Sequence, residues 1–161
     1  MIVRKATQND AHEIMWLFYN TVRTINRQDY SQEQVEAWAA PEPNAEKWAE
    51  RQQTRLVYVA EQEGQIVGFA ELERSGHIDC FYCHHQFQRQ GVGTELLHQL
   101  VAVAEGLEID CLFTEASITA HPFFERQGFS TLAAQEVVHR GVKFLNYRME
   151  RCLSGAEQRA V

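Results

Sequence analysis

The stretch Gln88-Arg89-Gln90-Gly91-Val92-Gly93 has the residue types of a phosphate-binding loop. It lies between an apolar, strand-like run at 78–83 and a helical pattern at 94–105. Glycines before a helix let backbone amides approach an anion closely, and the positive end of the helix dipole adds to the attraction. The sequence therefore predicts an anion site at this helix start.

Two common phosphate-binding motifs do not fit this loop. The dinucleotide-binding fingerprint needs a third glycine, but Leu96 stands at its position. A P-loop needs Gly-Lys-Ser/Thr, which does not follow. Hydride transfer and nucleotide hydrolysis are therefore both disfavoured.

The run Cys80-Phe81-Tyr82-Cys83-His84 has the formal pattern of haem attachment and, with His85, of half a zinc site. On a strand, however, Cys80 and Cys83 point to opposite faces and could not hold one ion, so we predict no metal. All four cysteines, at 80, 83, 111 and 152, are expected to be reduced thiols, because disulfide frameworks are typical of small secreted domains.

A mixed α/β arrangement must position these residues. Hydrophobic periodicity and capping signals predict a strand at 2–6, helices at 7–24, 31–40 and 44–53, strands at 56–60, 65–72 and 77–83, a helix at 94–105, a strand at 111–116, a helix at 119–127 and a hairpin of 129–138 with 142–150. Strand 111–116 should run parallel to strand 77–83, because a helix connects them.

Length and composition favour one domain over 1–152, followed by a polar tail over 153–161. The net charge of −7 argues against a nucleic-acid partner, which needs a basic surface. The sequence has no signal peptide and no apolar run long enough for a membrane span. We therefore expect a cytoplasmic protein without a membrane partner.

Two sequence blocks together resemble the GNAT family of acetyl-CoA-dependent N-acetyltransferases. The first, Phe81 to Leu97, carries Gln-x-x-Gly-x-Gly after a strand, and the second, Ser117 to Phe129, contains a helix that ends in Gly-Phe. The element order from Ile2 to Glu150 is also similar to the family fold. The resemblance implies a central, mixed and mostly antiparallel twisted sheet of about seven strands, flanked by about four to five helices and splayed between its two parallel central strands.

The resemblance also implies acetyl-CoA as co-substrate. Its pantetheine arm would lie between strands 77–83 and 111–116, and its pyrophosphate would meet the amides of the glycine loop. A backbone amide of strand 77–83 would stabilise the oxyanion formed on the acetyl carbonyl. The expected coenzyme contacts are Phe81, Tyr82, Cys83, Gln88, Arg89, Gln90, Gly91, Val92, Gly93, Thr94, Ser117, Phe123 and Phe124.

The implied reaction is direct transfer of acetyl to a primary amine of a small molecule or peptide in a ternary complex. The amine must lose a proton before it attacks, so a general base is needed. Alternation along strand 77–83 puts His77 and Asp79 on the face that leads to the acetyl position, and they are the first candidates. Glu71, on the neighbouring strand, is a lesser candidate.

Phe124 departs from the family pattern, in which a tyrosine often protonates the leaving thiolate. Tyr82 or Tyr147 could replace that tyrosine. A thiol pKa of about 8.5 also makes the thiolate a tolerable leaving group without a proton donor. The departure leaves a non-catalytic acyl-CoA-binding or regulatory module as the alternative function.

The segment 26–53 is expected to shape the acceptor pocket. Its aromatic residues Tyr30 and Trp38 are the candidates for substrate binding, and they suggest an amphipathic amine. Many domains of the resembled family form homodimers, and the sequence leaves that partner open.

Overall fold

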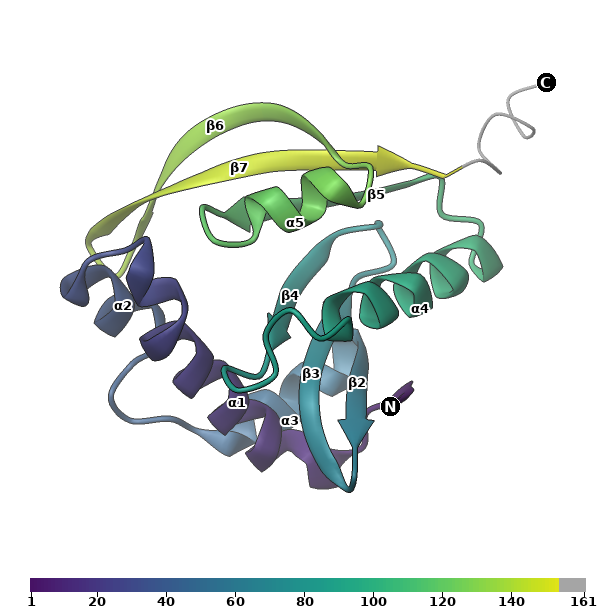
Figure 1. Cartoon of the computed structure of the whole chain (residues 1–161), viewed down its shortest axis with the longest axis horizontal. Helices are drawn as coiled ribbons and strands as arrows, with labels where there is room; N and C mark the ends of the chain where they lie inside the picture. The colour runs from purple at the N-terminus through teal and green to yellow at the C-terminus, as the bar shows by residue number, and fades with distance from the viewer. Residues whose placement is uncertain (154–161) are drawn as a thin grey trace.

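The chain folds into two antiparallel sheets that lie next to each other and diverge (Figure 1). The structure, a computed structural model, describes residues 1–153. The first sheet has the order β1-β2-β3-β4, and the second has the order β5-β7-β6. The strands are β1 (Ile2–Lys5), β2 (Leu56–Gln62), β3 (Gln65–Leu72), β4 (Ile78–Cys83), β5 (Cys111–Ser117), β6 (Ser130–His139) and β7 (Val142–Cys152).

The two sheets are joined where β4 and β5 begin. A parallel bridge pairs His77 with Phe113, and the Phe113 amide donates to the Gly76 carbonyl at 3.0 Å. Gly76 has a φ of +96°, and a Cβ there would lie 2.2 Å from the Cys111 carbonyl oxygen, so only glycine fits this close approach. Past this point no further backbone hydrogen bond joins β4 to β5 within residues 1–153. The predicted splay between two parallel strands is confirmed.

Helices cover both faces of the first sheet. On one face lie α1 (Ala11–Thr24) and α3 (Ala45–Thr54), and on the other lies α4 (Val92–Gly106) (Figure 1). The stripe of α1 packs Ile14 and Leu17 against Val59 and Phe69. A capping box begins this segment, because the Thr7 amide donates to Asp10 Oδ2 at 2.7 Å, as the sequence predicts.

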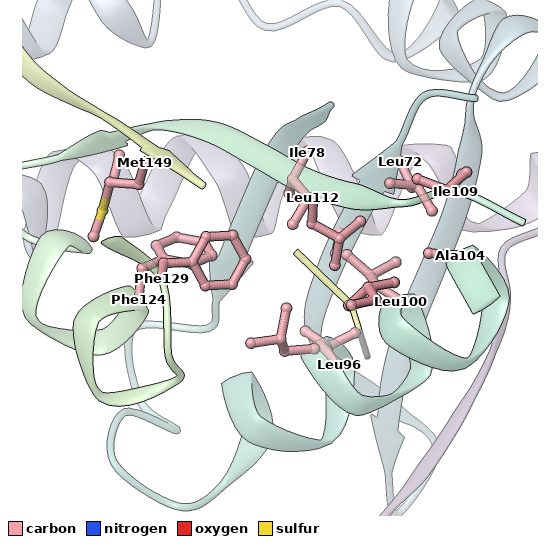
Figure 2. Packing of buried hydrophobic residues seen from close by; sticks show 14 of the residues in the cluster. Leu72, Ile78, Leu96, Leu100, Ala104, Ile109, Leu112, Phe124, Phe129 and Met149 are labelled. Atoms are coloured by element: carbon pink, nitrogen blue, oxygen red, sulfur yellow. The ribbon is translucent and has the colours of Figure 1, made fainter. Parts of the chain in front are cut away.

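The face of α4 that packs on the first sheet also contacts buried residues of the second sheet. Figure 2 shows Leu96 and Leu100 of α4 close to Leu112 of β5, with Phe124, Phe129 and Met149 in the same cluster. Phe124 comes from α5 (His121–Arg126), which lies next to β5. One core therefore fixes the position of α4 relative to both sheets.

The remaining helix, α2 (Gln32–Trp38), packs on β7 after a 3-10 turn, Asn26–Gln28. Ser31 caps it by accepting a hydrogen bond from the Gln34 amide at 3.1 Å. Val35 packs in a small cluster with Tyr30 and Phe144. This contact places the segment between α1 and α3 beside the opening where β4 and β5 separate.

The cysteines and the C-terminal residues differ from what the sequence predicts or lie partly outside the described residues. Cys111 and Cys152 are not free thiols but form a disulfide, because the register of β5 and β7 sets them directly opposite each other. Cys80 and Cys83 are free, as predicted. The polar tail predicted over 153–161 lies outside the described residues, except for Leu153, which is buried in the core.

No helix within the described residues is long and apolar enough to cross a membrane. Within residues 1–153, the seven predicted strands are all present, together with five α-helices. Their boundaries differ from the predicted ones by a few residues.

Candidate active site

A cavity of about 670 Å³ occupies the splay between β4 and β5. It extends from the Gln88–Gly93 loop and the start of α4 to the second half of β5. Twelve of the thirteen expected coenzyme contacts line it: Phe81, Tyr82, Cys83, Gln88, Arg89, Gly91, Val92, Gly93, Thr94, Ser117, Phe123 and Phe124. Gln90 does not, and its side-chain amide donates instead to the Gln86 carbonyl at 3.4 Å.

The glycine loop has the backbone of an anion site. Arg89 and Gly91 adopt positive φ values of 60° and 83°, and Gly91 is the N-cap of the 15-residue helix α4. Left-handed residues next to a helix start turn successive amides toward one side, which makes an anion-binding concavity. The Gln88 side chain fastens the loop, because its amide donates to the Cys83 carbonyl at 2.8 Å.

A second cavity, of about 350 Å³, continues from the first. Both cavities are lined by Trp38, Asp79, Tyr82, Glu115 and Ser117. The second cavity alone is lined by Tyr30, Val137, His139, Phe144, Leu145 and Asn146. The two expected substrate-binding aromatics, Tyr30 and Trp38, therefore both line it.

His77 lies behind this junction and lines neither cavity. Its Nδ1 is 2.8 Å from Glu73 Oε1, and its Nε2 is 2.5 Å from Glu115 Oε2. Burial lowers the pKa of His77, but the hydrogen bonds to Glu73 and Glu115 outweigh it and raise the pKa above its ordinary value. His77 is therefore linked to the cavity by its contact with Glu115, which lines it.

Asp79 and Glu71 are engaged by two arginines. Arg51 contacts Glu71 Oε2 and Asp79 Oδ2, each at 2.6 Å through Nη2, and Arg55 Nε lies 3.0 Å from Asp79. Glu71 is only 1% exposed and lines neither cavity, whereas Asp79 lines both. Two guanidinium groups thus balance two carboxylates at this edge of the site.

Tyr82 is partly buried, and its hydroxyl oxygen accepts a hydrogen bond from Trp38 Nε1 at 3.1 Å. Burial raises the pKa of Tyr82 well above its usual range, so the phenol keeps its proton at neutral pH. With the oxygen already accepting, the phenolic proton can be donated into the cavity.

The two free thiols are unsuited to covalent catalysis. Burial raises the pKa of Cys83 to about 12, and it raises the pKa of Cys80 well above its ordinary value. Only a thiolate is an effective nucleophile. Burial therefore disfavours a cysteine nucleophile at this site.

Comparison with known proteins identifies the fold and its family. The model of the acetyltransferase (GNAT) domain family matches residues 26–151. The chain belongs to the GNAT acetyltransferase family. It is 35% identical over 148 residues to the uncharacterized N-acetyltransferase YafP of Escherichia coli strain K12. The aligned region covers 91% of this chain and 93% of that protein.

Solved GNAT structures have the same architecture. The crystal structure of a GCN5-related N-acetyltransferase from Rhodopseudomonas palustris, described as a class-II aminotransferase, superposes with a TM-score of 0.89 and 31% identity, covering 94% of this chain and 95% of that chain. The PaiA N-acetyltransferase of Thermoplasma acidophilum superposes with a TM-score of 0.77, covering 94% and 98% of the two chains. At 16% identity the second match shows the fold alone.

The GNAT site contains two residues that the sequence reading missed, Glu115 and Asn146. Strand alternation could have found Glu115, because it lies two residues before Ser117 and so on the same face of β5. Asn146 could not have been found in this way, because it reaches the site through the pairing of β7 with β5 at Ser117.

Proposed function

We propose that this GNAT protein transfers the acetyl group of acetyl-CoA to a primary amine in a ternary complex. The carrying observation is the pair of connected cavities at the splay, one leading to the α4 N-terminus and the other to an aromatic wall. The donor occupies the first cavity and the acceptor enters through the second. The two meet at the shared residues Asp79, Tyr82, Glu115 and Ser117.

The glycine loop before α4 and the unpaired edges of β4 and β5 support the proposed position of acetyl-CoA. The coenzyme pyrophosphate accepts hydrogen bonds from the amides at the start of α4, and Arg89 adds a positive charge. The pantetheine arm lies along β4, whose backbone is not paired with β5 beyond the bridge at His77. The fold neighbour PaiA was solved in complex with coenzyme A, which supports coenzyme A as the carrier of the donor group.

In the proposed reaction, Glu115 takes the proton from the acceptor ammonium group. Glu115 lines both cavities, and its side chain is 43% exposed. His77 orients its carboxylate and, with Glu73, holds a hydrogen-bonded chain that leads away from the cavity. The predicted base His77 thus keeps a role in the proposal, as a positioning residue that acts through Glu115.

The other predicted catalytic residues receive different roles. Asp79 is held by Arg51 and Arg55 and contributes negative charge near the amine. Glu71 is buried beneath Arg51 and positions that arginine by hydrogen bonding. Tyr82 donates its phenolic proton to the departing thiolate, in place of the tyrosine for which Phe124 stands.

Thiol release from acetyl-CoA, measured across a panel of primary amines, tests the proposal. Acceptor-dependent release, with acetylated amine found by mass spectrometry, is the expected result. Phe124 favours one rival, a module that binds acyl-CoA without turnover, because this buried ring has no proton to give. Tight coenzyme binding with no release for any amine would establish that rival instead.

A further inference from the structure

The second cavity has a charge pattern that selects among amines. Its lining offers two carboxylates, Asp79 and Glu115, and no lysine or arginine among the residues that the structure describes. The charge of Asp79 is already balanced by Arg51 and Arg55, whereas Glu115 contacts only the imidazole of His77. His77 also bonds Glu73, so two carboxylates share one imidazole, and a net negative charge remains beside the point where the two cavities meet.

An unused hydrogen-bond acceptor lies on the same side of the cavity. Asn146 Oδ1 is buried and accepts no hydrogen bond from any described residue. Asn146 pairs with Ser117 across β5 and β7, and both residues line the cavity. A buried carbonyl oxygen without a donor costs free energy, so this atom calls for an N–H group or a water molecule.

One wall of the second cavity is aromatic. Tyr30, Trp38 and Phe144 form one packed aromatic group, with ring centroids 5.2 to 6.0 Å apart. The Tyr30 hydroxyl is already used, because it donates to the Leu145 carbonyl at 2.7 Å and accepts from the Ile118 amide at 2.9 Å. The wall therefore presents ring carbons rather than polar atoms to a ligand.

We propose that the acceptor is a small primary amine with an apolar body and no carboxylate beside its amino group, rather than an amino acid. This inference rests on the proposed function. The ammonium group lies between Glu115 and Asn146 Oδ1, and the apolar body lies on the aromatic wall. A carboxylate next to the amine would face Glu115, and the described lining offers no lysine or arginine to receive it. Such like-charge contacts are strongly unfavourable.

Matched pairs of acceptors that differ only in that carboxylate test the inference. Phenylethylamine is compared with phenylalanine and 3-methylbutylamine with leucine. Phenylalaninamide, in which a neutral amide replaces the carboxylate, serves as a control of the same size as phenylalanine. We expect kcat/KM for each amine to exceed that for its amino acid by about 100-fold or more, with the amide close to the amine.

A charge introduced at the cavity rim tests the cause. His139 lines the cavity and is exposed, so His139→Arg places a guanidinium there without disturbing the core. We expect this variant to raise kcat/KM for phenylalanine by about 10-fold relative to the matched neutral variant His139→Gln. Asn146→Leu removes the free oxygen and should raise KM for phenylethylamine.

The outcomes separate the inference from the proposed function. Equal kcat/KM values for the amine and the amino acid would overturn the inference and leave an N-acetyltransferase standing. Absence of acetyl transfer to every acceptor would overturn the proposed function, and the inference with it. Transfer to the amine alone, with a response to His139→Arg but not to His139→Gln, supports both.

Discussion

At the scale of single residues, the site depends on which carboxylates are already engaged. Asp79 and Glu71 share two arginines, whereas Glu115 shares one imidazole and opens on both cavities. Three acidic side chains of similar intrinsic chemistry thus differ in their partners and in their access to the cavities. Such differences cannot be predicted from a list of acidic residues.

The first prediction concerns Glu115. Glu115→Gln keeps the shape of the side chain but cannot take a proton, so kcat should fall by about 100-fold or more. Binding of coenzyme A, measured by calorimetry, should be unchanged. Glu136→Gln, at an exposed position on β6, is the matched control and should keep full activity. A Glu115→Gln enzyme with normal turnover would remove Glu115 from the mechanism.

The second prediction uses the raised pKa of His77. A group whose pKa is higher in the folded state stabilises the fold below its unfolded pKa, and this contribution is lost as the pH rises through the folded pKa. The stability difference between the wild type and His77→Gln should therefore be largest below about pH 6.5 and shrink at alkaline pH. Urea unfolding across this pH range measures it, with His98→Gln, an exposed position on α4, as control. A difference that grows with pH would contradict the prediction.

The third prediction concerns Tyr30, whose hydroxyl ties the segment before α2 to β7 and to the turn after β5. Tyr30→Phe keeps the ring but leaves the Ile118 amide and the Leu145 carbonyl without this partner. We expect a loss of about 1–3 kcal/mol in unfolding free energy and a higher KM for the amine. Tyr58→Phe, on β2, serves as the control for a lost hydroxyl away from both cavities. An unchanged melting temperature and KM would count against this anchoring role.

At the scale of elements, the helices and strands followed from periodicity and capping, whereas the register between distant strands did not. Local signals predicted the helix starts correctly: the capping box of Thr7 and Asp10, the cap at Ser31, and the glycines around 91 that precede α4. The contact of Asn146 with the cavity and the facing of Cys111 with Cys152 depend on the register of β7 against β5. Register is a long-range property, so neither could be predicted from local pattern.

A fourth prediction belongs to the loop that starts α4. Gly91 has a φ of +83°, and a Cβ at this position would meet no atom within 4 Å, so Gly91→Ala tests backbone conformation alone. We expect a loss of about 1 kcal/mol in stability together with weaker binding of coenzyme A. Gly106→Ala at the other end of α4 also meets open space, but its backbone is helical, so this control should be neutral or slightly stabilising. Equal effects of the two substitutions would argue against a conformational requirement at Gly91.

At the scale of the whole molecule, the two sheets share one core, and a covalent link joins two neighbouring strands at one end of the second sheet. The Cys111–Cys152 disulfide spans 41 residues and closes β5, α5, β6 and β7 into one loop. It corrects the expectation of four reduced thiols, which rested on composition and on the class of protein rather than on spatial proximity. The family blocks predicted the GNAT fold well, because they combine a local motif with the order of elements.

The fifth prediction follows from that loop. The chain-entropy relation for a 41-residue separation gives about 4 kcal/mol of stabilisation, so the double variant Cys111→Ser/Cys152→Ser should lose stability of about that size. Reductant should lower the stability of the wild type to the same level and leave the double variant unaffected. Thiol titration of the unreduced, denatured wild type should find two thiols, and a count of four would falsify the disulfide.

The single bridge between β4 and β5 has a further consequence, for solubility. Two neighbouring strand edges with unpaired backbone groups are a template for any extended chain, including a segment of another copy. An enzyme that keeps such edges open for its cosubstrate is exposed to edge-to-edge aggregation whenever the cosubstrate is absent. Coenzyme A should therefore delay light scattering on heating more than adenosine 3′,5′-bisphosphate, which lacks the arm that would cover these edges.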